Sequence, residues 1–250
     1  MEVRYEKHWS GHLNREMEFK VYGHSGKPVL FIPCQAGRFW DFEGFNMDKT
    51  WAPWIESGQV MVFSCDSIDN EAWAAMGADN RWRIENHEKW FRYITLELVP
   101  AIKHIAGTAN GYDQGILTFG CSLGATHAAN LFFRFPDVFC GCLAISGIFT
   151  SEYGFGSYMD DLVYNNCPVN YIANMPADHP YMALYNRQKS LIVVGQGDWE
   201  GPLLESTRRL DTVCAQKGIH TRFEYWGYDV AHDWPWWFKM VAHYVPQLLY

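Results

Sequence analysis

The stretch that decides the fold is Gly115–Asn130, with the sequence GILTFGCSLGATHAAN. It opens with an apolar run of the β type, passes through the pattern Gly-x-Ser-x-Gly, and continues into residues that favour a helix. A strand, a very tight turn and a helix in this order form a nucleophile elbow, in which glycines stand where a side chain would collide with backbone. Gly120 and Gly124 occupy those positions, so we expect Ser122 at the apex with its hydroxyl exposed. The alternative is a glycine-rich turn that carries a solvated serine.

Length and charge limit the classes of protein and partner. At 250 residues the chain is long enough for a single large α/β domain that spans residues 1–250. A formal net charge of −8 disfavours nucleic acid and anionic membrane surfaces as partners. No apolar run approaches a membrane span, and the N-terminus lacks the apolar core of a secretory signal. We therefore expect a cytoplasmic protein without nucleic-acid or membrane partners; assembly into a homo-oligomer stays open.

The seven cysteines are an odd number, and none of them stands in a CxxC pair or in a Cys/His spacing suited to zinc. A reducing compartment is the simplest interpretation, and no metal site is predicted. Cys121, at the second position of the elbow pattern, is expected to point away from the site and to serve packing only.

Short apolar or alternating runs recur along the whole chain and predict strands at residues 16–22, 28–33, 60–64, 116–119, 139–146, 190–194 and 221–226. Helices are predicted between them, at residues 48–57, 85–105 (bent at Pro100), 203–217 and 234–249. Residues 147–186 are rich in Tyr, Asn, Pro and Gly and are predicted to be irregular. The alternation of strands and helices indicates an α/β fold with a mostly parallel central sheet and helices on both faces.

An elbow serine becomes a strong nucleophile only when a base takes its proton and a third group orients that base. In a parallel sheet these partners lie on loops at the carboxyl ends of later strands. Asp198 follows the strand at residues 190–194 through two glycines, and His232 follows the last strand. The order Ser, Asp, His is that of the α/β-hydrolases. We therefore predict a catalytic triad of Ser122, His232 and Asp198.

Other acidic residues compete with Asp198 for the third position. Asp229 and Asp233 are too close to His232 in sequence to clamp its ring from the opposite side. Glu200 is the most serious alternative, although a carboxylate at the start of a helix is also explained by the helix dipole. Glu205 is a weaker competitor, and His127 is expected to pack inside the structure.

An oxyanion hole needs preorganised donors where negative charge develops. One donor is predicted to be the backbone N–H of Leu123, directly after the nucleophile. The second is predicted on the loop after the strand at residues 28–33, at Gln35 or Ala36, with Gln35 preferred.

Three segments of the chain form a recognisable combination: Gly120-Cys121-Ser122-Leu123-Gly124, Gly197-Asp198-Trp199 and Ala231-His232-Asp233-Trp234-Pro235-Trp236-Trp237. Together they resemble the putative-esterase family of α/β-hydrolases, which includes esterase D (S-formylglutathione hydrolase), bacterial feruloyl esterases and mycolyltransferases. The resemblance implies an α/β-hydrolase fold with a small lid or none, no cofactor, and the triad given above. Relatives of esterase D carry a His-Gly-Leu type oxyanion segment, whereas this chain has Pro33-Cys34-Gln35-Ala36-Gly37. This departure weakens the transfer of activity on glutathione thioesters, although a thioesterase similar to S-formylglutathione hydrolase stays an alternative.

Aromatic and acidic residues near the predicted site are candidates for substrate contacts. Phe39, Trp40, Trp199 and Trp234 are predicted to line the pocket, and Phe42 and Trp236 belong to the same aromatic groups, although ordinary packing explains any single one of them. Tyr158, Asp160 and Asp161 are candidates for the substrate rim, and a solvated acidic turn explains the aspartates equally well.

These residues predict a serine esterase that hydrolyses carboxylic esters with short acyl chains through an acyl-enzyme intermediate. The alternative is an acyltransferase or thioesterase that uses the same site. A non-catalytic binding protein on a hydrolase fold is disfavoured, because each triad position holds a competent residue. The partner is a small-molecule ester.

Overall fold

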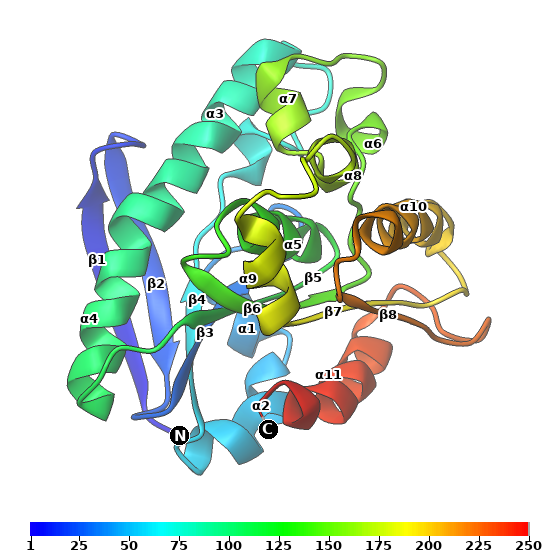
Figure 1. Ribbon diagram of the computed structural model, residues 1–250. Helices are drawn as coiled ribbons and strands as arrows, with labels where there is room; N and C mark the ends of the chain where they lie inside the picture. Colours follow the sequence, from blue (N-terminus) through cyan, green and yellow to red (C-terminus); the bar gives the residue numbers. More distant parts are fainter. Residues whose placement is uncertain (250) are drawn as a thin grey trace. The chain divides into compact units, whose positions relative to one another are not determined.

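The computed structural model describes residues 1–249. The chain divides into two compact units, the first Met1–Leu117 and the second beginning at Thr118. Each unit contains both strands and helices (Figure 1). The α/β class predicted from the sequence is therefore observed in both units. That the whole chain forms one domain stays a prediction.

The first unit contains strands β1 to β4, in the order β1-β2-β4-β3. The strands are β1 (Val3–Ser10), β2 (Arg15–Tyr22), β3 (Lys27–Ile32) and β4 (Val60–Cys65). β3 and β4 pair in parallel, while β2 pairs with both β1 and β4 in the antiparallel sense. Among the strands of residues 1–249, β1 is the one that the sequence did not predict. Successive residues of β1 alternate between exposed and half-buried up to the buried Ser10, because β1 is an edge strand that pairs only with β2.

The helical part of the first unit comprises α1 (Asp41–Gly44), α2 (Met47–Glu56), η1 (Asp69–Glu71), α3 (Asn80–Tyr93), η2 (Ile94–Leu98) and α4 (Val99–Asn110). The predicted single helix at residues 85–105 is in fact longer and has three parts, with a π-helical turn at η2. Pro100 follows this turn and has no N–H for the carbonyl four residues earlier, which is a physical reason for the irregular hydrogen bonding there. The run α3 to α4 lies along β1 and β2 (Figure 1). The rings of His8 on β1 and Tyr93 on α3 stack with their centroids 5.7 Å apart.

The second unit begins within β5 (Ile116–Cys121) and contains β6 (Phe139–Ile145), β7 (Lys189–Val194) and β8 (Arg222–Tyr225), in the order β5-β6-β7-β8. β6 pairs with β7 and β7 with β8 in parallel. The prediction of a mostly parallel arrangement is therefore confirmed, with β1 and β2 as the antiparallel exceptions.

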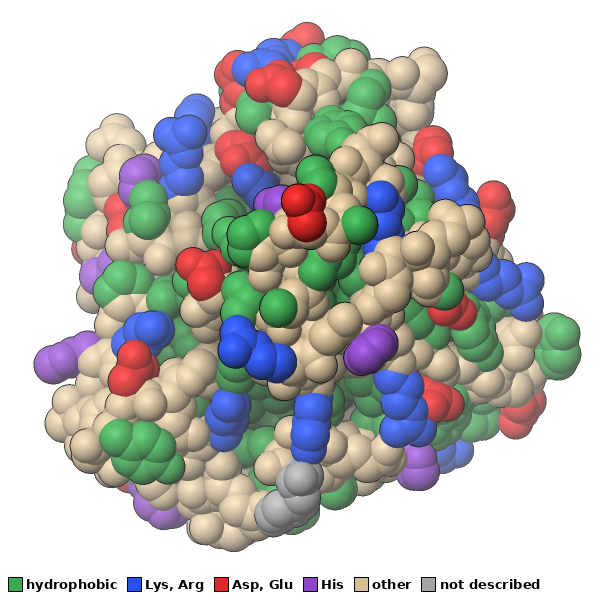
Figure 2. Space-filling model, in the orientation of Figure 1, with side chains coloured by type: hydrophobic (Ala, Val, Ile, Leu, Met, Phe, Trp, Pro, Cys, Tyr) green, Lys and Arg blue, Asp and Glu red, His purple; other side chains and the backbone are tan. Residues whose placement is uncertain are grey.

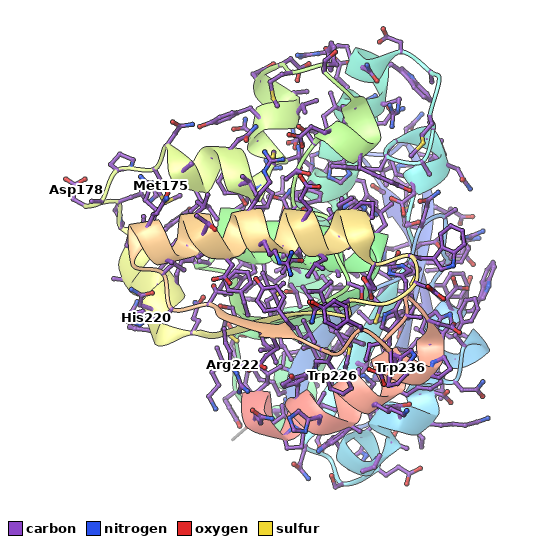
Figure 3. All side chains as sticks on the ribbon, turned by 90° about the vertical axis from the view of Figure 1, so that its right-hand side faces the viewer. Met175, Asp178, His220, Arg222, Trp226 and Trp236 are labelled. Atoms are coloured by element: carbon purple, nitrogen blue, oxygen red, sulfur yellow. The ribbon has the colours of Figure 1, made fainter. Side chains whose placement is uncertain are left out.

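The helices of the second unit are α5 (Leu123–Arg134), α6 (Glu152–Phe155), α7 (Asp161–Asn165), α8 (Pro168–Ala173), α9 (Tyr181–Arg187), α10 (Gly201–Lys217) and α11 (Trp234–Leu249). α10 and α11 lie on opposite sides of β7 and β8 (Figures 1 and 3). α5 is buried from Gly124 to Phe133, and its residues there are apolar except for Thr126, His127 and Asn130.

Residues 147–186, which the sequence predicted to be irregular, contain the four short helices α6 to α9. None of these helices exceeds seven residues, which explains why no helical periodicity was evident. Two of them begin at signals visible in the sequence: Asp160 caps α7 by accepting a 2.8 Å hydrogen bond from the Val163 N–H, and Pro168 opens α8.

The surface charges and the hydropathy of the helices are relevant to the predicted absence of nucleic-acid and membrane partners. Acidic and basic side chains are interspersed over the face seen in Figure 2. Within residues 1–249, no helix is both long enough and apolar enough to cross a bilayer. The absence of nucleic-acid and membrane partners and the cytoplasmic location stay predictions. The oligomeric state stays open.

Candidate active site

Ser122 stands at the junction between β5 and α5 with φ 57° and ψ −130°, a conformation that few side-chain-bearing residues adopt. The tight turn brings Gly124 against the end of the strand, so that a Cβ on Gly120 would lie 2.4 Å from the carbonyl carbon and oxygen of Gly124. Only glycine fits at position 120. The strand, turn and helix that the sequence predicts are therefore present, and the N-terminus of α5 points at the serine.

His232 lies on the loop that follows β8. Figure 3 shows β8 running from Arg222 towards Trp226, with Trp236, near the start of α11, on the Trp226 side. The Nε2 atom of His232 is 3.0 Å from the Oγ of Ser122. The imidazole is thus within hydrogen-bond distance of the serine hydroxyl, which is the relation a general base needs.

Glu200 is the carboxylate nearest to the other nitrogen of that ring. Its Oε2 is 3.5 Å from the Nδ1 of His232, and its side chain is completely buried. Its Oε1 accepts a 2.5 Å hydrogen bond from the hydroxyl of Ser146. A buried carboxylate is costly unless it is paired. Here the Ser146 hydroxyl supplies a hydrogen bond to Oε1, and the imidazole lies within ion-pair distance of Oε2 but beyond an ordinary hydrogen bond. α10 begins at the next residue, so its N-terminal dipole also favours the negative charge.

Asp198, the acid preferred from the sequence, occupies a different place. It is exposed to solvent, and its contact with His232 is made by its carbonyl oxygen, which accepts a 2.9 Å hydrogen bond from the His232 backbone N–H. Trp199 has φ 67°, and this left-handed residue turns the chain so that the following side chain, Glu200, points inward. The choice of Asp198 over Glu200 therefore does not agree with the geometry.

A sequence signal for Glu200 was present. Gly201 and Pro202 follow it, and Pro202 stands in the first turn of α10. This places Glu200 at the cap position before the helix and not in its solvated first turn, where the dipole alone would explain a carboxylate.

Gly195 and Gly197 shape the loop in another way: a Cβ on either would come within 3 Å of the carbonyl oxygen of Val230. These glycines let the loops after β7 and β8 approach each other.

Of the two predicted oxyanion donors, Leu123 is in the second unit. It is the first residue of α5, so its backbone N–H has no acceptor within the helix and is available to a ligand. Gln35 lies in the first unit, exposed, on a loop where Ala36 has φ 57° and donates its N–H to the Asp69 carboxylate at 3.3 Å. The role of Gln35 stays a prediction.

The four predicted substrate-contacting aromatics differ in exposure. Trp199 is 84% exposed, whereas Trp234 is half-buried and packs edge-on against Trp237, with ring centroids 4.9 Å apart. In the first unit, Phe39 is 6% exposed and packs against Trp40, which is itself 43% exposed. The burial of Phe39 is consistent with a packing role. Substrate contacts by Phe39, Trp40, Trp199 and Trp234 stay predictions.

The candidate rim residues are engaged in local structure. The hydroxyl of Tyr158 donates to Asp160 at 2.7 Å, and Asp160 also caps α7. Asp161 is the first residue of that helix. Capping therefore accounts for Asp160 without a substrate. His127 is buried within α5, as expected.

The sequence predicts no metal site and a reducing compartment for the cysteines; residues 1–249 bear on both predictions. No group of three or more His, Cys, Asp or Glu side chains in this part of the chain is arranged to hold a metal ion. All seven cysteines are thiols, and Cys121 is buried in β5.

Comparison with known proteins places this chain in a family. The family model described as "Putative esterase" matches residues 10–248. Among solved structures, a ferulic acid esterase is 16% identical with a TM-score of 0.73, and the match covers 99% of this chain and 97% of that one. S-formylglutathione hydrolase (FrmB) from Staphylococcus aureus is 13% identical with a TM-score of 0.70, covering 100% and 97%. MPT51 (FbpC1) from Mycobacterium tuberculosis is 13% identical with a TM-score of 0.68, covering 98% of each chain. No curated protein sequence matches.

The fold is that of the α/β-hydrolases, as the sequence predicts, with a serine at the nucleophile elbow. The family model spans nearly the whole chain, so the chain belongs to the putative-esterase family. It is therefore an enzyme of the carboxylic-ester hydrolase class, and the resemblance seen in its sequence motifs is confirmed.

Proposed function

We propose that this enzyme hydrolyses carboxylic esters through an acyl-enzyme intermediate on Ser122, with His232 as general base and Glu200 as the acid of the triad. The observation that carries the proposal is the line of contacts from the Ser122 hydroxyl through both ring nitrogens of His232 to the buried Glu200 carboxylate. Nucleophile, base and orienting acid in this relation are the requirement for activating a serine.

In the proposed reaction the Oγ of Ser122 attacks the ester carbonyl while Nε2 of His232 accepts its proton. The imidazolium then donates that proton to the departing alcohol, which leaves the acyl group on Ser122. Water attacks this acyl-enzyme in the same way, with His232 again taking and returning a proton. Glu200 holds the ring with Nδ1–H towards its carboxylate and stabilises the transient positive charge. The Leu123 N–H, at the start of α5, stabilises the oxyanion.

The proposed substrates are small esters with short acyl chains. Relatives of the same fold include a ferulic acid esterase, which supports ester substrates, and an S-formylglutathione hydrolase, which keeps a thioesterase as the alternative. A thioester and an oxygen ester pass through the same acyl-enzyme, so the site chemistry does not separate them. Transfer of the acyl group to an alcohol instead of water is the remaining variant.

A fluorophosphonate probe tests the chemistry directly, because it forms a covalent bond only with an activated serine. We expect one probe per chain, found by mass spectrometry on the peptide that contains Ser122, and no labelling of Ser122→Ala. Labelling of a different residue would contradict the proposal. Matched short-chain oxygen esters and thioesters, with and without added alcohol, then distinguish esterase, thioesterase and transferase.

A further inference from the structure

Ser146 is a buried residue that the sequence did not mark for function. It follows β6, is completely inaccessible to solvent and has φ 56°. Its backbone N–H donates to the carbonyl oxygen of Val193 at 2.7 Å, which fixes it against the end of β7. Its hydroxyl donates to Oε1 of Glu200 at 2.5 Å. The side chain of Ser146 therefore holds the carboxylate oxygen that does not face the histidine.

Trp237, on α11, contacts both sides of the same arrangement. Its indole N–H donates to the hydroxyl oxygen of Ser146 at 3.2 Å. Its ring packs edge-to-face against the ring of His232, with centroids 4.9 Å apart and an interplanar angle of 89°. The buried Trp237 side chain thus packs directly against the base, His232, and is linked to the acid, Glu200, through the Ser146 hydroxyl.

The hydrogen-bonding capacities of these groups determine which group donates and which accepts in each hydrogen bond. An indole N–H can only donate, so Trp237 occupies a lone pair of the Ser146 hydroxyl and leaves the hydroxyl proton for Glu200. The carboxylate accepts it on Oε1, which directs Oε2 to Nδ1 of His232. The Glu200–His232 separation of 3.5 Å is longer than an ordinary hydrogen bond, so this contact alone orients both groups poorly.

We propose that Ser146 and Trp237 are positioning residues that hold Glu200 and His232 in their catalytic relation. The inference rests on the proposed function, in which Glu200 orients His232. A purely structural role is the competing explanation, because a buried carboxylate needs a hydrogen-bond donor in any case. The two explanations differ in what removal of the hydroxyl does to kcat when stability is measured separately.

Two substitutions of Ser146 separate activity from stability. Ser146→Ala and Ser146→Gly both remove the hydroxyl, but only glycine adopts φ 56° without strain, so the two variants should differ in thermal midpoint. If the hydroxyl positions Glu200, both variants should lose about 10–100-fold in kcat to a similar extent, with KM within about 3-fold of wild type. Trp237→Phe keeps a ring against His232 and removes the N–H donor, so we expect a smaller kcat loss, with KM again unchanged.

A double-mutant cycle tests whether the hydroxyl acts through Glu200. In Glu200→Gln, a further Ser146→Gly substitution should change kcat by less than about 3-fold, because the carboxylate it positions is gone. Two results would overturn the proposal while Ser122→Ala is still inactive. In the first, the kcat values of the Ser146 variants fall in proportion to their thermal midpoints. In the second, Ser146→Gly lowers kcat as much in the Glu200→Gln background as it does in the wild type. Turnover by Ser122→Ala would instead reject the proposed function itself, and the positioning role with it.

Discussion

The Oε2 atom of Glu200 lies 3.5 Å from Nδ1 of His232, while the carboxylate of Asp198, two residues earlier, is exposed to solvent. The loop after β7 therefore uses its two acidic residues differently. Asp198 supports the histidine loop through its backbone carbonyl, and Glu200 supplies the buried negative charge. The left-handed Trp199 between them separates the two roles.

The nucleophile is tested by Ser122→Ala. Alanine removes the Oγ that lies 3.0 Å from His232, and we expect kcat for a p-nitrophenyl ester to fall by about 10⁵–10⁶-fold. Circular dichroism should show an unchanged fold, because only one oxygen atom is lost. A variant that retains a tenth of wild-type activity would move the nucleophile to another residue.

The elbow is tested by Gly120→Ala. The added methyl group would lie 2.4 Å from the backbone of Gly124, so the turn must shift. We expect a loss of stability of about 1–3 kcal/mol or more, together with lower activity. Gly107→Ala on α4 is the matched control, because its Cβ would meet nothing closer than 3.9 Å. The control should be neutral or stabilised by up to about 1 kcal/mol. Equal thermal midpoints for the two variants would contradict the steric argument.

The sequence predicted those parts of the fold that depend on neighbours along the chain. The elbow at Ser122 and the last helix were predicted because glycine spacing and apolar periodicity are local signals. The sequence favoured Asp198 whereas the geometry favours Glu200, because the direction of the Glu200 side chain depends on the backbone of Trp199, whose left-handed conformation no propensity indicates. Ser146 was missed for a similar reason, since its partners Glu200 and Trp237 are distant in sequence.

Thiol chemistry is predicted to be slow and unrelated to activity. Burial raises the pKa of Cys142 to about 12, and burial with nearby Asp41 and Asp69 raises that of Cys34 to about 12 as well. At pH 8 a thiol with such a pKa is ionised to only about 10⁻⁴, compared with roughly a quarter for an ordinary cysteine. We expect native protein treated with iodoacetamide to be alkylated first at the half-buried Cys140, with full activity retained. Rapid inactivation that a substrate prevents would contradict a packing role for Cys121.

The role of Trp199 is tested with aromatic esters. The indole is 84% exposed and adjacent to Glu200, so Trp199→Ala should leave the thermal midpoint unchanged. If the ring stacks on substrate, KM for an aryl ester should rise by roughly 2–10-fold. Trp9→Ala is the control, because Trp9 is also exposed, at 61%, and no substrate contact is predicted for it. Equal KM values for the two variants would remove Trp199 from the substrate site.

The most direct test of the central claim compares kcat of Glu200→Gln and Asp198→Asn, both checked for folding by circular dichroism. An amide at the true acid favours the wrong tautomer of the imidazole and costs about 10³–10⁴-fold in kcat. Because Glu200 is the carboxylate beside Nδ1, we expect Glu200→Gln to lose activity to that extent. Asp198→Asn keeps the backbone carbonyl that His232 uses and should stay within about tenfold of wild type. The reverse ranking, with Asp198→Asn nearly inactive and Glu200→Gln active, would contradict the assignment of Glu200.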